Sequence, residues 1–252
     1  MRVDRHQKLG IKQTIQKSWM DKTVQMMLAG LTEKQIRAEL DEFLSTQMQS
    51  GGIGSRGPNT YGMAIAILSS WFAPEPALMD FRNDVLAKVR ELPSSEWLPL
   101  HWAVVSSAYP FWSGVARRVG RLLNLQDQIT QAQIFDRLKA RYGDRETVAR
   151  NARYTVRSFI AWNVLRDVGT KGCYERVSQL EINDKEVAIL LIESALLCKP
   201  AAKCELRMLL NDPALFPFKL PVMSGDLISV NNARIDVVRY GIDDDLLALN
   251  YV

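Results

Sequence analysis

Arginine and tyrosine side chains recur at helical spacing between residues 144 and 167, and they are the residues of this chain best suited to holding a ligand. A guanidinium group presents a planar fork of donors that fits phosphate oxygens and guanine edges, so a row of arginines favours a polyanion such as duplex DNA. The alternative is an ordinary solvated basic helix that keeps the protein soluble. The candidate contact residues here are Arg145, Thr147, Arg150, Arg153, Tyr154 and Arg157.

A helix that positions these side chains must bury its other face. The spacing predicts a helix that starts after Asp144, whose carboxylate is expected to cap the first turn. A helix with one apolar face held by its domain and basic N-terminal turns facing outward is typical of a recognition helix in the major groove. The residues that share the apolar face are Val148, Ala152, Val156, Phe159, Ile160 and Val164.

The flanking segments predict a helix-turn-helix with a wing. Thr130 and Gln133 have the spacing of a capping box, and the helix that they open is expected to end at a left-handed Gly143. A Gly-Asp turn then joins it to the basic helix. Downstream, two short strands are expected around a turn from Gly169 to Gly172, with Lys171 at the tip as a phosphate contact.

A further helix over residues 111–125 is expected to open this unit. Its outer face carries Arg117, Arg118 and Arg121, which we predict to contact phosphates. Between Arg117 and Arg176 there are 13 Lys/Arg and 6 Asp/Glu, a local net charge of +7, although the whole chain is only +4. The positive charge is therefore concentrated on the proposed DNA-binding unit.

Composition indicates an ordinary globular protein of 252 residues, 47% hydrophobic and 24% charged. The three cysteines are an odd number without paired spacing, which favours a reducing cytoplasm over a disulfide scaffold. The longest apolar runs, residues 61–72 and 187–198, are shorter than the roughly 20 residues that cross a bilayer, so we expect no membrane segment or membrane partner.

The apolar periodicity predicts a mainly α fold: a helical bundle with winged-helix or helix-turn-helix units and small β-hairpins. Helices are expected over residues 9–29, from Thr32, from Thr60, over 77–92, from Ser94, over 184–198 and over 201–210. A brief helical turn is expected from Ser224 or Asp226, followed by a hairpin of residues 235–240 and 246–251.

Three parts are expected along the chain. Residues 1–57 form an N-terminal helical hairpin and a Gly-rich linker, residues 58–182 a helical core with the winged-helix unit, and residues 183–252 a second winged-helix-like unit. The last part is acidic and would repel a phosphate backbone, so we interpret it as a partner-binding or homodimerisation module. Gly52 to Gly57 match G-x-G-x-x-G, but without the flanking strand and helix of a dinucleotide site they indicate a linker.

No pattern of catalytic residues stands out, and we predict neither an enzyme nor a cofactor. The only two histidines, His6 and His101, are isolated in the sequence, and a lone histidine in an apolar helix is more often structural than a general base. No Cys-x-x-Cys or His-x-x-x-His pair is present to hold zinc, and no P-loop or G-x-S-x-G elbow occurs.

The order of these elements resembles the BrxA-type accessory proteins of BREX phage-defence systems over roughly residues 23–170. The resemblance implies a helical, non-catalytic protein that binds double-stranded DNA beside other components of a bacterial defence complex. Other winged-helix proteins, transcription regulators among them, and a helical adaptor for an acidic protein partner remain alternatives. The similar stretches are the helix ending at Leu28–Gly30, the core helices from Tyr61, the stretch Leu100–Pro110, and the helix pair running to Trp162–Leu165.

Overall fold

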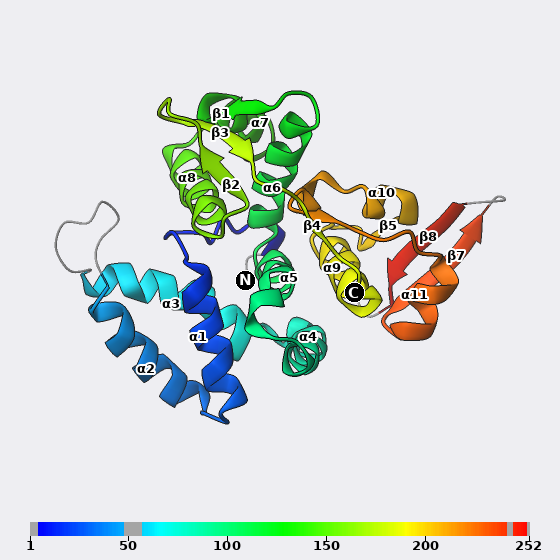
Figure 1. Ribbon diagram of the computed structural model, residues 1–252, viewed down its shortest axis with the longest axis horizontal. Helices are drawn as coiled ribbons and strands as arrows, with labels where there is room; N and C mark the ends of the chain where they lie inside the picture. Colours follow the sequence, from blue (N-terminus) through cyan, green and yellow to red (C-terminus); the bar gives the residue numbers. More distant parts are fainter. Residues whose placement is uncertain (1–4, 48–56, 241–243, 251–252) are drawn as a thin grey trace.

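The computed structural model describes residues 5–47, 57–240 and 244–250, and these residues form a mainly helical protein with a few small strand groups (Figure 1). The N-terminal helices α1 to α3 lie at one corner. Helices α6 to α8 with strands β1 to β3 lie at a second corner, and the elements from α9 onward lie at the right-hand side. Helix α5 runs between these parts.

The N-terminal part is built from three helices: α1 (Lys17–Leu28), α2 (Glu33–Ser45) and α3 (Pro58–Phe72). Thr32 begins α2 with both hydrogen bonds of a capping box to Gln35, as predicted. The helix predicted from residue 9 is wrong in its first half. A 3-10 turn (Arg5–Gln7) opens the described chain, and the buried Ile11 and Ile15 lie in a non-helical segment before α1.

The start of that segment is fixed by Gly10. Its φ is +73°, and a Cβ atom at this position would lie 2.4 Å from the ring of Tyr109. A left-handed backbone pressed against an aromatic ring requires glycine, and it breaks the helical pattern that the apolar spacing suggested.

Three helices form the centre: α4 (Met79–Glu91), α5 (Leu98–Ala108) and α6 (Pro110–Leu123). Short 3-10 turns, Pro76–Leu78 and Ser94–Glu96, precede α4 and α5. Helix α5 is buried on almost every side, from Pro99 to Ser107, and it packs on α9. A helix that is apolar around its whole circumference belongs in the interior, which explains its central place.

Helix α6 begins a compact α–β unit. It is followed by β1 (Gln128–Thr130), α7 (Gln131–Tyr142), α8 (Glu146–Ala161), β2 (Leu165–Asp167) and β3 (Cys173–Arg176). The three strands form one antiparallel sheet in the order β1-β3-β2. The β2–β3 hairpin was predicted, whereas β1 was not, because three residues are too few to show an alternating pattern.

The C-terminal part consists of one long helix and several short elements. Helix α9 is buried from Val187 to Leu197, and Asp184 caps it by accepting from two backbone N–H groups, as predicted. The helix predicted over residues 201–210 is wrong in its first half, because residues 203–205 form a strand. The elements are β4 (Leu180–Glu181), α9 (Lys185–Leu197), β5 (Lys203–Glu205), α10 (Leu206–Leu210), a 3-10 turn (Pro213–Leu215), β6 (Phe218–Lys219), α11 (Gly225–Asn231), β7 (Ile235–Tyr240) and β8 (Asp244–Leu249).

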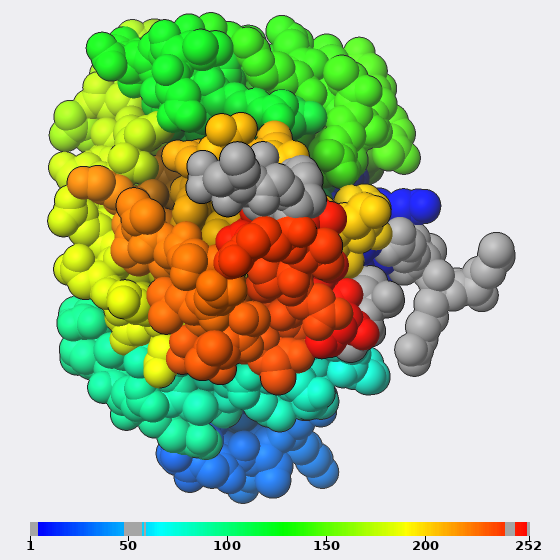
Figure 2. All heavy atoms as spheres, turned by 90° about the vertical axis from the view of Figure 1, so that its right-hand side faces the viewer, coloured from blue at the N-terminus to red at the C-terminus, as the bar shows by residue number. Residues whose placement is uncertain are grey.

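These strands form two sheets. Strands β4 and β6 pair in parallel, and β5, β8 and β7 form an antiparallel sheet in the order β5-β8-β7. The predicted terminal hairpin is therefore present, with β5 as a third strand. Figure 2 shows this sheet and α11 covering one face of the molecule, below α6 and α7.

One connected cluster of buried side chains runs from Ile11 to Leu249. Its densest region is aromatic: Trp102 of α5 contacts Trp112, Phe159, Phe216 and Phe218, with ring centroids 5.0 to 5.7 Å apart. Helices α5, α6 and α8 and the segment around β6 meet there. The division into residues 1–57, 58–182 and 183–252 stays a prediction.

Candidate nucleic-acid interface

The rear face of α8 fixes this helix to the rest of the protein. Phe159 stacks on Trp102 with centroids 5.0 Å apart and meets the edge of Trp112 at 4.8 Å. The N-terminal segment adds two hydrogen bonds: the N–H of Ile15 donates to Ser158 Oγ, and Trp162 Nε1 donates to the carbonyl of Ile15, both at 2.9 Å. The helix is therefore held rigidly with its opposite face outward.

The outward face of α8 carries the predicted cations. Arg150, Arg153 and Arg157 are exposed, as is Thr147, while Tyr154 is half-buried. Within the described ranges 5–47, 57–240 and 244–250, no carboxylate forms an ion pair with any of these three arginines. Unneutralised arginines on a rigid helix are available to a phosphate or a base edge.

The start of α8 differs from the sequence-based expectation. Asp144 does not cap the helix, because its carboxylate lies 3.4 Å from Lys139 Nζ. The residue before the first turn is Arg145, which makes no side-chain cap and instead donates from Nη2 to the carbonyl of Tyr142. Gly143 has a positive φ of 82° with an extended ψ of 160°, so the chain turns sharply without a left-handed helical residue. Arg145 is exposed and remains a candidate contact.

The β2–β3 hairpin lies beside α8. Gly169 and Gly172 both have positive φ values, 69° and 80°, and Lys171 between them is exposed at the tip. Burial raises the pKa of Tyr174 in β3, and the charges of Arg157 and Arg153 act in the opposite direction. Arg157 and Arg153 therefore lie near the hairpin, whose strand β2 also carries the exposed Asp167, and the charge of Asp167 acts on the pKa of Tyr174 in the direction opposite to the two arginines.

The predicted Arg117–Arg118–Arg121 face is not a single surface. Arg117 is turned inward: its Nε and Nη2 donate to the Asp212 carboxylate at 3.1 and 2.7 Å, and its side chain is 13% exposed. Because Asp212 already takes up this guanidinium group, the expected phosphate contact at Arg117 is corrected to a structural ion pair. Arg121 is exposed, and Arg118 is half-buried.

A second basic cluster consists of Arg118, Arg121 and Arg141, and Arg141 was not among the residues predicted from the sequence. Burial lowers the pKa of Arg118, and the neighbouring charges of Arg121 and Arg141 lower it further. Like charges that perturb one another are close together and attract anions. Arg141 lies in the last turn of α7, and the basic end of that helix is the sequence signal that could have found it.

A cavity of about 630 Å³ opens beside the first turns of α8. It was not predicted, since its walls come from segments far apart in the sequence: the leading segment, α3 and α8. Arg150 belongs both to this cavity and to the outward face. The lining residues are Lys8, Leu9, Gly10, Lys12, Met63, Thr147, Arg150, Asn151 and Tyr154.

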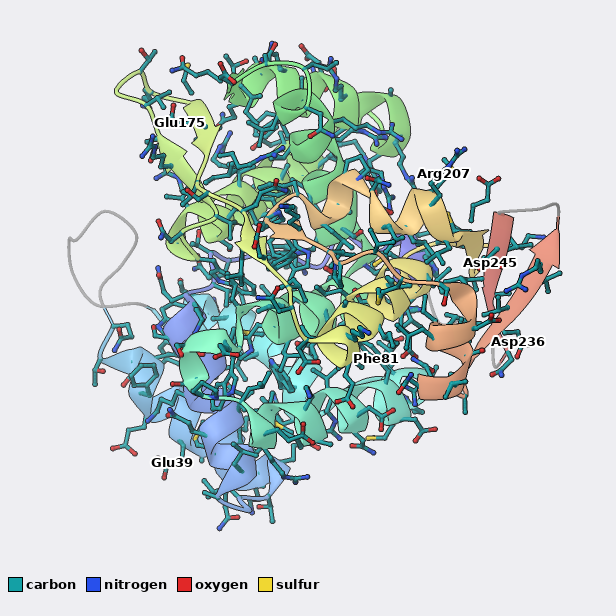
Figure 3. All side chains as sticks on the ribbon, turned by 45° about the vertical axis from the view of Figure 1, so that its right-hand side comes forward. Glu39, Phe81, Glu175, Arg207, Asp236 and Asp245 are labelled. Atoms are coloured by element: carbon teal, nitrogen blue, oxygen red, sulfur yellow. The ribbon has the colours of Figure 1, made fainter. Side chains whose placement is uncertain are left out.

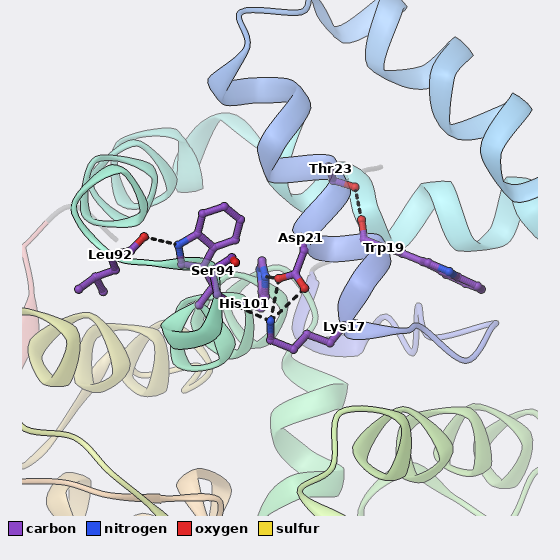
Figure 4. Close-up of polar contacts among 8 residues, drawn as sticks. Lys17, Trp19, Asp21, Thr23, Leu92, Ser94 and His101 are labelled. Atoms are coloured by element: carbon purple, nitrogen blue, oxygen red, sulfur yellow. Dashed lines mark hydrogen bonds and ion pairs between the residues drawn. The ribbon is translucent and has the colours of Figure 1, made fainter.

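His101 takes part in a buried contact between α5 and α1 (Figure 4). Its Nε2 lies 2.9 Å from the Asp21 carboxylate, which also accepts from Lys17 Nζ at 2.8 and 3.0 Å. Burial of the ring lowers the pKa of His101 despite the nearby Asp21. Burial also opposes ionisation of Asp21, but the hydrogen bonds from His101 and Lys17 lower the pKa of this carboxyl group. This cluster joins two helices.

A search of the described residues finds no group of three or more His, Cys, Asp or Glu side chains arranged to hold a metal ion. Over the same residues, the helices fall short of the length and apolar character needed to span a bilayer. The G-x-G-x-x-G pattern lies outside the described residues except for Gly57, which directly precedes α3.

Comparison with known proteins gives no relative from which a role is transferable. No protein-family model, no curated protein and no solved structure matches this chain. The resemblance to BrxA-type proteins therefore rests on the residues quoted for it and stays a prediction.

Proposed function

We propose that this protein binds double-stranded DNA without catalysing a reaction on it, through a winged-helix unit of residues 110–176. The observation that carries the proposal is the outward face of α8, where Arg150, Arg153 and Arg157 are exposed and have no carboxylate partner among the described residues. A polyanion supplies the missing negative charge along such a row.

The order of elements supports a winged helix. A helix, a short strand, a helix pair joined by three residues, and a β-hairpin follow one another. Strand β2 of the hairpin contacts the second helix of the pair. In such units the second helix reads the major groove while the hairpin tip contacts the backbone. Lys171 has that place here.

The charge distribution separates this unit from the C-terminal sheet. In Figure 3, Glu175 marks the hairpin at one end of the molecule, and Asp236 and Asp245 lie in the C-terminal sheet at the other. Residues 177–252 carry 7 Lys/Arg and 11 Asp/Glu, so a DNA backbone is attracted to one end and repelled from the other. We propose that the acidic end contacts a protein partner or a second copy, for which the exposed Val230 and Val238 supply apolar surface.

Fluorescence anisotropy with a labelled duplex of about 20 base pairs, measured between 50 and 200 mM salt, tests the proposal. A triple variant with glutamine at Arg150, Arg153 and Arg157 is expected to lower the salt slope by about 2.7, at roughly 0.9 per phosphate contact. Over this fourfold salt range, the factor by which the wild type loses affinity should then be roughly 40 times the factor by which the variant loses affinity.

A matched control removes three positive charges elsewhere. Arg90, Lys185 and Arg207 are exposed and form no ion pair within the described part of the chain. Their triple glutamine variant has the same net charge as the α8 variant and should keep the wild-type slope. Equal losses in both variants, or wild-type protein that binds an acidic polypeptide but not duplex DNA, would contradict the proposal and favour the adaptor alternative. Tighter binding to duplex RNA would assign the site to RNA.

A role in phage defence, beside other components of a defence complex, is the narrower form of this proposal. It is supported by the resemblance over roughly residues 23–170. Loss of protection against phage on deletion of the gene, restored by the wild-type chain but not by the α8 triple variant, is the expected result.

A further inference from the structure

The cavity beside α8 has the charge and apolar character of a small-ligand site. Lys12 and Arg150 both line it, and both are exposed without an ion pair among the described residues. Lys8 lines it too, but its Nζ is 3.0 Å from the carboxylate of Glu75. Two available cations, one from the leading segment and one from α8, suit a phosphate group.

The remaining wall is apolar and aromatic. Met63 of α3 is 41% exposed, although large apolar side chains are usually covered, and it lines the cavity together with Leu9 and the half-buried Tyr154. The volume of about 630 Å³ is typical of small-molecule sites, which run from roughly 300 to 1,000 Å³. A planar, partly apolar group fits against this wall.

A buried acceptor without a partner lies at the same place. Asn151 is 4% exposed and lines the cavity. Its Nδ2 donates to the carbonyl of Thr147 at 2.7 Å, which fixes the orientation of the amide, and its Oδ1 has no hydrogen-bond partner. The Oδ1 atom is enclosed, with less than 1 Å² of accessible surface, so Asn151 belongs to the wall of the cavity and Oδ1 is not a contact for a ligand.

The walls are formed in advance. Gly10 is pressed against the ring of Tyr109, whose hydroxyl donates to the carbonyl of Ala66 in α3. Five residues further on, both backbone groups of Ile15 are hydrogen-bonded, one to Ser158 of α8 and the other to Trp162, which directly follows this helix. A cavity whose walls are held on both sides loses little entropy when a ligand binds.

We propose that this cavity binds a nucleotide unit. Its phosphate lies between Lys12 and Arg150, and its base lies against Met63 and Tyr154. The nucleotide is either free or part of a DNA strand whose end or unpaired base reaches the cavity. The site shares Arg150 with the proposed DNA interface but does not depend on that interface.

Titration calorimetry with dAMP, dGMP, dCMP and dTMP, and with ribose 5-phosphate as a base-free probe, tests this proposal. At least one nucleotide is expected to bind with a Kd below about 1 mM, and ribose 5-phosphate at least about tenfold more weakly. Lys12→Glu and Met63→Trp should each weaken nucleotide binding about tenfold or more. Lys34→Glu makes the same charge change on an exposed residue of α2 and should leave binding unchanged.

Three results would overturn the proposal: no nucleotide binding in the millimolar range, equal affinity for ribose 5-phosphate, or equal effects of Lys12→Glu and Lys34→Glu. Circular dichroism of each variant confirms that it is folded, and Lys12 and Met63 are exposed enough that both changes are compatible with the fold. Nucleotide binding without duplex binding would support this site and refute the DNA-binding proposal. Duplex binding without nucleotide binding would support the DNA-binding proposal and refute this site.

The two sources of the nucleotide are separated with DNA. A blunt duplex and the same duplex with a three-nucleotide overhang are compared on the wild type and on Met63→Trp. A preference for the overhang that Met63→Trp removes assigns the site to a strand end. Equal affinity for both duplexes, together with binding of at least one of the four free nucleotides, assigns the site to a free nucleotide.

Discussion

Replacing Arg117 by methionine should destabilise the fold without weakening DNA binding by the folded protein. Methionine keeps most of the buried apolar stem but removes the guanidinium group that pairs with Asp212, whose side chain is 3% exposed. Removing one partner of a buried ion pair costs about 3–5 kcal/mol, because the other charge is left in a poor solvent. The carboxylate of Asp212 keeps the N–H of Ala214 at 2.9 Å and Lys199 at 3.4 Å, so we expect about 3 kcal/mol.

For a chain of this length, 1 kcal/mol corresponds to about 2–4 °C in Tm, so thermal unfolding should shift downward by about 6–12 °C. The cost should also depend on pH. Burial alone raises the pKa of Asp212, and it is the pairing with Arg117 that brings this pKa below its usual value. In the wild type the stabilisation from this low pKa is present above the unfolded-state value of 3.8 and is lost as the pH falls below it. Without Arg117 the carboxyl group takes up a proton at higher pH, so the deficit should be larger at pH 7.5 than at pH 5.

The control is Arg121→Met, the same change on the exposed side of α6. It should alter the free energy of unfolding by less than about 0.5 kcal/mol. The reasoning would be refuted if Arg117→Met left the Tm within about 2 °C of the wild type while reducing DNA affinity more than Arg121→Met. Arg117 would then be a DNA contact after all.

Three further predictions concern the scaffold. Gly120→Ala should prevent or severely weaken folding in thermal-unfolding assays, because its Cβ would lie 2.0 Å from the carbonyl oxygen of Pro213; wild-type stability would contradict this contact. His101→Phe should flatten the decline of Tm between pH 7 and 5: burial lowers the pKa of His101, so the wild type loses stability as the pH falls below the unfolded-state value of 6.5. An unchanged pH profile in the variant would refute it. Thr130→Ala should cost about 1 kcal/mol in chemical denaturation, since it removes the capping box with Gln133, and no loss would show that the cap contributes little.

The structure was predicted most accurately from the sequence where all the residues that determine a feature lie within one helix or turn. The amphipathic pattern of α8 indicated its buried face through Val148 and Phe159 and its exposed face through Arg150 and Arg153, and the structure has both. Capping boxes at Thr32 and Thr130 and the glycines around Lys171 were also readable, because they depend on neighbours within a few residues.

Features that depend on distant partners were not readable. Arg117 was taken for a surface residue, because nothing near it in the sequence shows that Asp212 lies opposite. Ile11 and Ile15 have helical spacing, but tertiary packing holds them in a non-helical segment, and local pattern yields to such packing. The cavity beside α8 joins residues 8–12, Met63 and α8, so only the fold reveals it.

Ile15 forms hydrogen bonds with Ser158 and Trp162. In the sequence, Ser158 is 143 positions and Trp162 is 147 positions away from Ile15. During synthesis Ile15 leaves the ribosome long before Ser158 and Trp162 exist, so these two hydrogen bonds form only after both partners have been made, although Lys8 and Gly10 have partners earlier in the chain, Glu75 and Tyr109. Contacts of such long sequence separation form late and slow the search for the native state. We therefore expect the basic helix to reach its final rigidity only in the closing steps of folding.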